Sequence, residues 1–140
     1  MLKGIPKIIS PELLKVLCEM GHGDEIVIGD GNFPSQSMGK ICIRCDGHSA
    51  TDILDAILQV FPLDTYAQPL YLMEKVKGDT VETPIWDKFK EITAKYTTAE
   101  FEHIERFAFY ERAKNAYAVI ATGESALYAN VIIKKGVVTE

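Results

Sequence analysis

A histidine and two carboxylates lie in two glycine-rich turns that flank one short apolar segment. His22 and Asp24 belong to the first turn, and Asp30 belongs to the second, Gly29–Gly31. Imidazole titrates near neutral pH, and glycine lets a small ligand come close to the backbone. The pattern therefore predicts proton transfer to a small ligand at His22. A structural alternative stays open, because a histidine at a helix C-terminus also complements the helix dipole.

Asp30 follows a predicted strand over residues 25–30. Open α/β sheets hold their ligands beyond the carboxyl ends of their strands, which favours a binding role for Asp30. Aspartate is also common in turns, where its side chain bonds the local backbone. Both interpretations remain open for this residue.

A second group of candidate residues lies near the C-terminus. Arg106–Arg112 combines a guanidinium with three aromatic rings, and Tyr128-Ala129-Asn130 adds a hydroxyl and an amide. At the end of a predicted strand, Arg106 could bind hydroxyls or a carboxylate through its guanidinium fork while an aromatic side chain packs on the apolar face of a ligand ring. The alternative is that Phe107 and Phe109 are core residues and that Arg106 pairs with a neighbouring glutamate.

Other chemistries have weak support in the sequence. The histidines lack the spacing of a zinc site, so no metal is predicted. The two GxG segments do not extend into a nucleotide-binding pattern, and no serine lies in a GxSxG elbow. Cys42 and Cys45 match CxxC, but a strand would place them on opposite faces. A small redox protein that uses these two thiols is kept as a minor hypothesis.

Composition limits the possible partners and the number of domains. The chain has 140 residues, 47% of them hydrophobic, a formal net charge of −5 and a pI near 5.2. These values favour one domain over residues 1–140, and they disfavour nucleic acid and membrane as partners. Glycine and proline interrupt residues 1–6 before an apolar targeting segment could form, and three cysteines suit a reducing compartment. We therefore expect a cytoplasmic protein.

Apolar periodicity and capping residues predict alternating strands and helices. Ser10 is expected to cap the first helix, and Ser49 or Thr51 the second. Helices are expected over residues 11–20, 50–61, 84–96 and 110–115, and strands over 25–30, 41–45, 69–76, 103–107, 117–122 and 128–134. The strands are apolar runs rather than alternations, so helices should cover both faces of the sheet. This pattern predicts a single three-layer α/β/α domain.

Several segments of the chain, in register over essentially its whole length, resemble the ribose pyranase and fucose mutarotase family. These segments are Met1-Leu2-Lys3, Ser10–Leu14, Met20–Glu25, Phe33-Pro34, Pro62-Leu63-Asp64, Arg106–Ala113 and Lys134–Val137. The resemblance implies a mixed, mostly parallel central sheet. It also implies a cofactor-free isomerase that interconverts the α and β anomers of a free monosaccharide, with L-fucose favoured.

The resemblance also assigns site residues and an assembly. It makes His22 the proton-transferring residue, with no metal. It places the following residues around the sugar: Asp30, Arg106, Tyr110, Tyr128, Ala129 and Asn130. It further implies a homo-oligomeric ring, commonly a decamer of two stacked pentamers, in which a neighbouring subunit completes each pocket.

Mutarotation suits these side chains, because ring opening and closure need one group that accepts a proton and one that donates it. We hypothesise that Asp30 orients His22 or a sugar hydroxyl, and that Tyr110 or Tyr128 is a second proton relay. Tyr110 stands where ribose-type members tend to have a second histidine, which favours the fucose-like branch. Asn32 and Ala129 depart from common fucose-type residues. A D-ribose pyranase and a non-catalytic monosaccharide-binding protein therefore remain alternatives.

Overall fold

A mixed six-stranded sheet forms the centre of the molecule. The computed structural model describes all of residues 1–140. The strands are β1 (Glu25–Gly29), β2 (Cys42–Cys45), β3 (Leu70–Met73), β4 (Glu102–Ile104), β5 (Ala118–Thr122) and β6 (Val131–Lys134). They lie in the order β2-β5-β1-β6-β3-β4, and only β6 runs antiparallel to its neighbours, β1 and β3. The expected mixed, mostly parallel sheet is confirmed.

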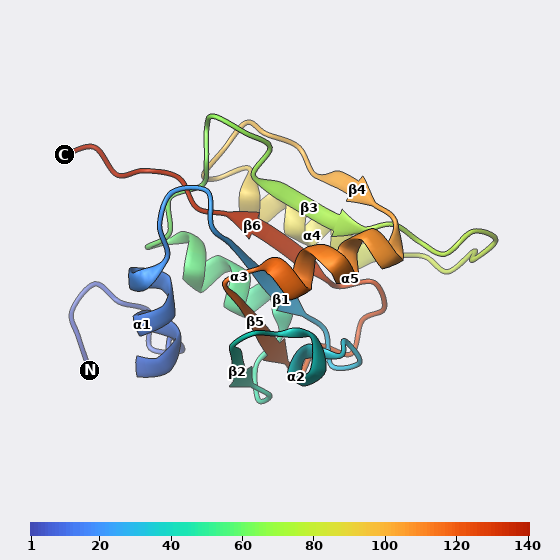
Figure 1. The fold of residues 1–140 in the computed structure, drawn as a ribbon, viewed down its shortest axis with the longest axis horizontal. Coiled ribbons are helices and arrows are strands. Elements are labelled where there is room, and N and C mark those ends of the chain that lie inside the picture. Colours follow the sequence, from blue (N-terminus) through green and yellow to red (C-terminus); the bar gives the residue numbers. More distant parts are fainter.

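Five helices cover the two faces of this sheet. They are α1 (Pro11–Glu19), α2 (Ser35–Met38), α3 (Ala50–Leu58), α4 (Pro84–Thr93) and α5 (Arg106–Asn115). Figure 1 shows α5 and α2 in front of the sheet and α3 and α4 behind it, and α1 packs into the same core as α3 and α4. In β1, Ile26 and Ile28 face that larger core, while Val27 faces the smaller one beneath α5. The predicted three layers are therefore present.

Polar side chains start two of the helices as the sequence predicts. Ser10 Oγ accepts a hydrogen bond of 3.1 Å from the backbone N–H of Leu13 at the start of α1. Ser49, rather than Thr51, caps α3 by accepting from the N–H of Asp52 at 3.1 Å. Thr83 precedes α4 without making a side-chain cap. None of the five helices is both long enough and apolar enough to cross a membrane.

The segment around Arg106 differs from the expectation. The predicted strand to residue 107 ends at Ile104, and α5 begins at Arg106 instead of residue 110. The cause is Glu105, whose carboxylate accepts hydrogen bonds from the backbone N–H groups of Phe107 at 2.9 Å and Ala108 at 3.0 Å. Such a cap satisfies free N–H groups of the first turn and places a negative charge at the positive end of the helix dipole. Arg106 therefore starts a helix.

Two loops also differ from their expected form. Residues 35–38, expected to be loop, form the short helix α2. The last strand, expected from residue 128, begins only at Val131. Tyr128 has a φ of 56°, a left-handed conformation that interrupts a strand. Tyr128, Ala129 and Asn130 therefore lie in the loop that leads into β6.

Candidate functional site

A pocket of about 260 Å³ lies beyond the carboxyl ends of β1 and β3. It is lined by Asp30, Asn32, Phe33, Met73, Val76, Asp79, Arg106, Tyr110, Leu127, Tyr128 and Asn130. Five of the six residues assigned to sugar contact from sequence are among them. The topology explains this gathering, because parallel strands end at the same edge of a sheet and their loops meet there.

Asp30 forms the buried floor of this pocket and is 6% exposed. Its carboxylate accepts hydrogen bonds from the backbone N–H groups of Asn32 at 3.0 Å and Ala129 at 3.3 Å. Its own N–H donates to Asn130 Oδ1 at 2.8 Å. Burial raises the pKa of Asp30, while the hydrogen bonds from the N–H groups of Asn32 and Ala129 oppose the rise by stabilising the carboxylate. The result is a fixed acceptor suited to a hydroxyl.

Ala129 contributes through its backbone only. Its side chain is fully buried in the larger core and does not line the pocket, in contrast to the sequence-based expectation. The Ala129 side chain therefore packs in the core beneath the pocket. Its backbone N–H donates a hydrogen bond to the Asp30 carboxylate.

Arg106 reaches the pocket from the first turn of α5. Its Nε donates to the hydroxyl of Tyr110 at 3.1 Å, and its guanidinium carbon lies 5.4 Å and 5.5 Å from the ring centres of Phe107 and Tyr110. It pairs with no glutamate, and its two Nη groups have no partner within the chain. The alternative in which Arg106 pairs with a glutamate is thus excluded, and the two Nη groups of the guanidinium are available to a ligand. Phe109 is in the core as that alternative expected, whereas Phe107 is 66% exposed.

Tyr128 ties the pocket to the loop between β3 and α4, which extends away from the body of the molecule in Figure 1. Its hydroxyl donates to Asp79 Oδ2 at 2.6 Å and accepts from the N–H of Val76 at 3.1 Å. The Tyr128 hydroxyl lowers the pKa of Asp79, and the Asp79 carboxylate raises that of Tyr128. Sequence reasoning missed Asp79. Its signal was a Gly-Asp turn shortly after the end of a predicted strand.

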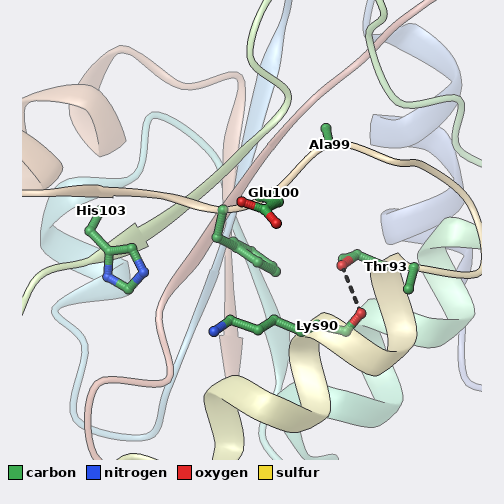
Figure 2. A pocket seen from close by; sticks show the side chains of 7 residues that line it. Lys90, Thr93, Ala99, Glu100 and His103 are labelled. Carbon is green, nitrogen blue, oxygen red and sulfur yellow. Dashed lines mark hydrogen bonds between the residues drawn. The ribbon is translucent and has the colours of Figure 1, made fainter.

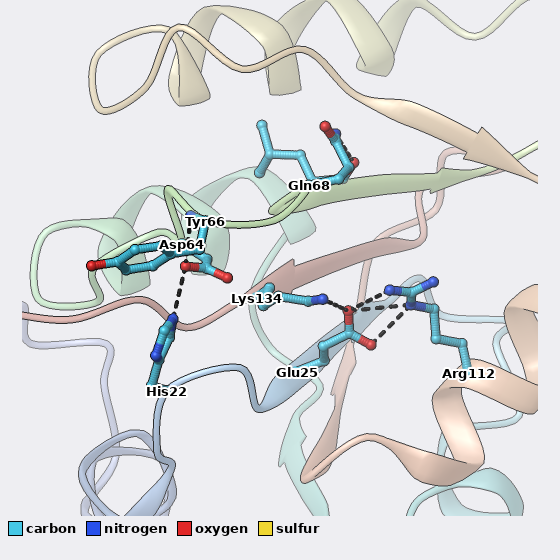
Figure 3. Close-up of polar contacts among 8 residues, drawn as sticks. His22, Glu25, Asp64, Tyr66, Gln68, Arg112 and Lys134 are labelled. Atoms are coloured by element: carbon cyan, nitrogen blue, oxygen red, sulfur yellow. Dashed lines mark hydrogen bonds and ion pairs between the residues drawn. The ribbon is translucent and has the colours of Figure 1, made fainter.

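His22 lies at the opposite end of β1 from Asp30. Its Nε2 is 3.0 Å from Asp64 Oδ1, and its ring centre is 5.2 Å from that of Tyr66 (Figure 3). The five residues of β1 separate the two ends by roughly 15 Å, at about 3.3 Å per residue. Asp30 therefore does not contact His22 within one chain, and the carboxylate bonded to the imidazole is that of Asp64. Asp24 belongs to the turn, as expected, since its carboxylate accepts from the N–H of Gly21 at 2.8 Å.

A second hollow, of about 250 Å³, lies between α4 and the edge strand β4 (Figure 2). Lys90 and Glu100 bring opposite charges to its lining, which also contains His103, and the hydroxyl of Thr93 donates to the Lys90 carbonyl at 3.3 Å. Partial burial, with a smaller contribution from Lys90, lowers the pKa of His103. None of the residues predicted for the site lies here.

The two cysteines of the CxxC segment are unsuited to redox chemistry. Cys45 is buried in the larger core, whereas Cys42 is not part of that core. Burial raises the pKa of both thiols, and thiolate is the reactive form. No three His, Cys, Asp or Glu side chains are placed to hold a metal ion.

Known proteins match the chain over almost its whole length. FucU from Bifidobacterium longum has a TM-score of 0.95 and 63% identity, covering 98% of this chain and 100% of that one. The fucose mutarotase of Streptococcus pneumoniae, solved in complex with L-fucose, has a TM-score of 0.94 and 49% identity, covering 99% and 100%. The protein named fucose mutarotase in Danio rerio is 51% identical over 98% of this chain and 94% of its own length.

A family comparison leads to the same group of proteins. The model of the RbsD / FucU transport protein family matches residues 3–138. With this coverage, and with relatives above 30% identity along the whole sheet, the chain belongs to the RbsD / FucU family.

Proposed function

We propose that this protein is an L-fucose mutarotase, an isomerase that interconverts the α and β anomers of free L-fucose without a cofactor. The carrying observation is that Asp30, Arg106, Tyr110, Tyr128 and Asn130 line one pocket. Relatives at 49% and 51% identity are named fucose mutarotases, and one of them was solved with L-fucose. Hydroxyl-binding groups beside exposed aromatic edges suit a monosaccharide with one apolar face.

The proposed reaction needs one base and one acid. His22 takes the proton of the anomeric hydroxyl as the C1=O1 double bond forms and the C1–O5 bond breaks, and an acid protonates O5. The aldehyde rotates and the ring closes by the reverse transfers, so no proton is gained or lost. The Tyr110 hydroxyl suits the acid role, because it accepts from Arg106 and its own proton has no acceptor in the chain. The Tyr128 proton is already bound by Asp79.

We propose further that His22 reaches the pocket of a neighbouring subunit in a homo-oligomeric ring, with a decamer of two pentamers as the expected form. Supporting this, β1 separates His22 from the pocket of its own chain. Exposed apolar side chains lie near both places: Tyr66, 78% exposed, beside His22, and Leu127, 52% exposed, at the pocket. An interface between copies would cover both patches.

We also propose that residues 1–140 act as one mutarotase domain in the cytoplasm. One sheet uses strands from residue 25 to residue 134. All three cysteines are free thiols, which suits a reducing compartment.

Saturation-transfer NMR tests the activity. Irradiating one anomeric proton of L-fucose should reduce the signal of the other anomer in the presence of the protein, and D-ribose should respond less. A larger loss of signal between the forms of D-ribose than between the anomers of L-fucose would identify ribose, rather than fucose, as the substrate. Binding of fucose by calorimetry without any transfer would identify a non-catalytic sugar-binding protein instead.

Subunit complementation tests the shared site. At a fucose concentration well below the KM of the wild type, His22→Ala and Asp30→Asn chains are each expected to retain only a small fraction of the wild-type activity. Co-expressed with two different tags and purified as mixed oligomers, they should recover about a quarter of the wild-type activity, since random assembly pairs an intact His22 with an intact Asp30 in about one site in four. Mixed oligomers as inactive as the single variants would show that both groups act within one chain.

A further inference from the structure

We infer that Trp86 is a positioning residue for the sugar pocket. Its indole N–H holds the peptide group between Tyr128 and Ala129, and this peptide group places both the Tyr128 side chain and the Asp30 carboxylate. Trp86 is not among the residues that line the pocket, so it acts through its neighbours rather than by touching the sugar. This inference deepens the proposed function and rests on it.

The backbone of Tyr128 has a conformation that needs support from other parts of the chain. Tyr128 is the one non-glycine residue with a positive φ, which is 56°. In this left-handed region the Cβ atom of an L-residue crowds the following carbonyl oxygen. Single residues persist there only where the surrounding contacts hold them. The hydrogen bonds next to Tyr128 must therefore supply that hold.

Two partners hold the same peptide group from its two sides. The Tyr128 carbonyl accepts from Trp86 Nε1 at 2.8 Å, and the Ala129 N–H donates to Asp30 Oδ2 at 3.3 Å. The carbonyl and the N–H of a trans peptide lie in one plane and point in opposite directions. Rotating this plane would break both hydrogen bonds and would take a donor away from the Asp30 carboxylate. Trp86 and Asp30 therefore fix one peptide group together.

The indole of Trp86 is itself held in place. Trp86 lies in the first turn of α4, and its ring packs against the larger core. The His103 ring meets it edge to face, with 4.8 Å between the ring centres, and Lys75 Nζ lies 5.5 Å from the indole centre. An indole has a single donor and no acceptor, so the direction of its bond to Tyr128 is unambiguous. Trp86 is thus a fixed donor beside the pocket.

The segment that leads from β3 to Trp86 also binds the far end of Tyr128. The Tyr128 hydroxyl accepts from the N–H of Val76 and donates to Asp79. The carbonyl and the hydroxyl of one residue are therefore both bound to residues 76–86. Two anchors at opposite ends of Tyr128 set the direction in which its ring lies along the pocket.

The alternative role for Trp86 is packing alone, and Trp86→Phe separates the two roles. Phenylalanine keeps an aromatic ring on the core but has no donor for the Tyr128 carbonyl. The matched control is Thr93→Val. Thr93 also lies on α4 and donates to a backbone carbonyl, that of Lys90, but it does not line the sugar pocket. Each variant therefore removes one side-chain donor from a backbone carbonyl.

Trp86→Phe should raise KM for fucose exchange about two- to tenfold, the range expected for the loss of one net hydrogen bond. The value of kcat should stay close to that of the wild type, because His22 and Tyr110 have partners on other elements. Thr93→Val should change neither constant. A folded Trp86→Phe protein with the wild-type KM, a loss confined to kcat, or an equal rise of KM in both variants would overturn the inference.

Combination with Asp30→Asn gives a readout that packing would not move. Since Trp86 and Asp30 hold the same peptide group, the rise of KM in the double variant should be smaller than the product of the two single rises. Thr93→Val combined with Asp30→Asn should give the simple product. A simple product for the Trp86→Phe double variant would contradict a shared peptide group.

The indole N–H gives a test that needs no variant. Trp86 is the only tryptophan, so nitrogen-15 labelling of tryptophan yields a single indole signal. A bonded indole N–H should exchange with solvent more slowly than that of free tryptophan, and equally fast exchange would overturn the inference even if Trp86→Phe fails to fold. Fucose binding without anomer exchange by the wild type would refute the proposed function. Calorimetry would then decide the role of Trp86, with weaker fucose binding by Trp86→Phe supporting it and unchanged binding overturning it.

Discussion

The two ends of strand β1 are built in different ways. At the N-terminal end, residues 134–136 form backbone hydrogen bonds with the turn of His22 on one side and with the segment of Asp64 on the other, and the His22 and Asp64 side chains are paired. At the C-terminal end, the loops place Asp30, Arg106 and their neighbours around a pocket with free donors and acceptors. One end therefore has a single imidazole held by backbone contacts, and the other end has a pocket with unpaired donors and acceptors.

Charge pairing differs between the two ends as well. Near His22, Glu25 receives a two-pronged ion pair from Arg112 and a longer contact of 3.7 Å from Lys134 (Figure 3). The Arg112 guanidinium also stacks 4.0 Å from the Tyr71 ring centre. In the pocket, Asp30 has only uncharged donors and half of the Arg106 fork is free. The charged groups of the first end are therefore paired within the chain, whereas part of the Arg106 guanidinium at the second end is free to bind a ligand, as the proposed function requires.

The largest loss of activity is expected from His22→Ala. Loss of general acid–base catalysis should lower the exchange rate about 10²- to 10⁴-fold, while fucose binding changes little because the pocket is intact. Saturation-transfer NMR measures the rate, and circular dichroism checks the fold. A folded variant with the wild-type rate would remove His22 from the mechanism.

Asp30→Asn tests the other end. The amide loses the charge-assisted bond to a sugar hydroxyl, so KM should rise about 10- to 100-fold, corresponding to the 1.5–3 kcal/mol typical of such bonds. Steady-state exchange measurements over a range of fucose concentrations give kcat and KM separately. An effect on kcat alone, with KM unchanged, would contradict a binding role.

Gly136→Ala tests the packing of residues 134–136 against the segment that carries Asp64. The close approach to the Leu63 carbonyl should destabilise the fold by about 1–3 kcal/mol, the usual cost of forcing atoms into a packed site. The control is Gly47→Ala, because a Cβ there meets no atom within 4 Å. Urea unfolding measures both. Equal midpoints for the two variants would show that residues 134–136 do not constrain the segment around Asp64.

The smallest expected effect is the pH dependence of stability that comes from Asp64. Because its pKa is lowered in the folded state, the unfolded chain binds a proton more readily. The contribution to stability is therefore present above the unfolded pKa of about 3.9 and is lost as pH falls through the lower folded value. Asp64→Asn should flatten the decline of Tm below about pH 4 relative to wild type. An unchanged slope would mean that Asp64 gains no stabilisation on folding.

Much of the fold could be predicted because its signals are local. The Ser10 cap, the apolar face of α1 and the apolar run of β1 each need only neighbouring residues. The start of α5 was predicted wrongly, because the strand was expected to continue to residue 107 while the Glu105 side chain caps a helix at Arg106. A single hydrogen-bonding side chain therefore ended the strand early.

Residue types show which groups are available for chemistry, and the family resemblance assigns a site to His22, Asp30, Arg106, Tyr110, Tyr128, Ala129 and Asn130. Which of these residues meet depends on the folded chain. His22 and Asp30 are eight residues apart, yet the extended strand β1 places them at its opposite ends. Asp30 and Asn130 are distant in sequence but are joined by a hydrogen bond. Asp64 and Asp79 likewise became visible only through their partners. The physical reason is that a strand separates residues along its length, and loops from separate strands converge at its ends.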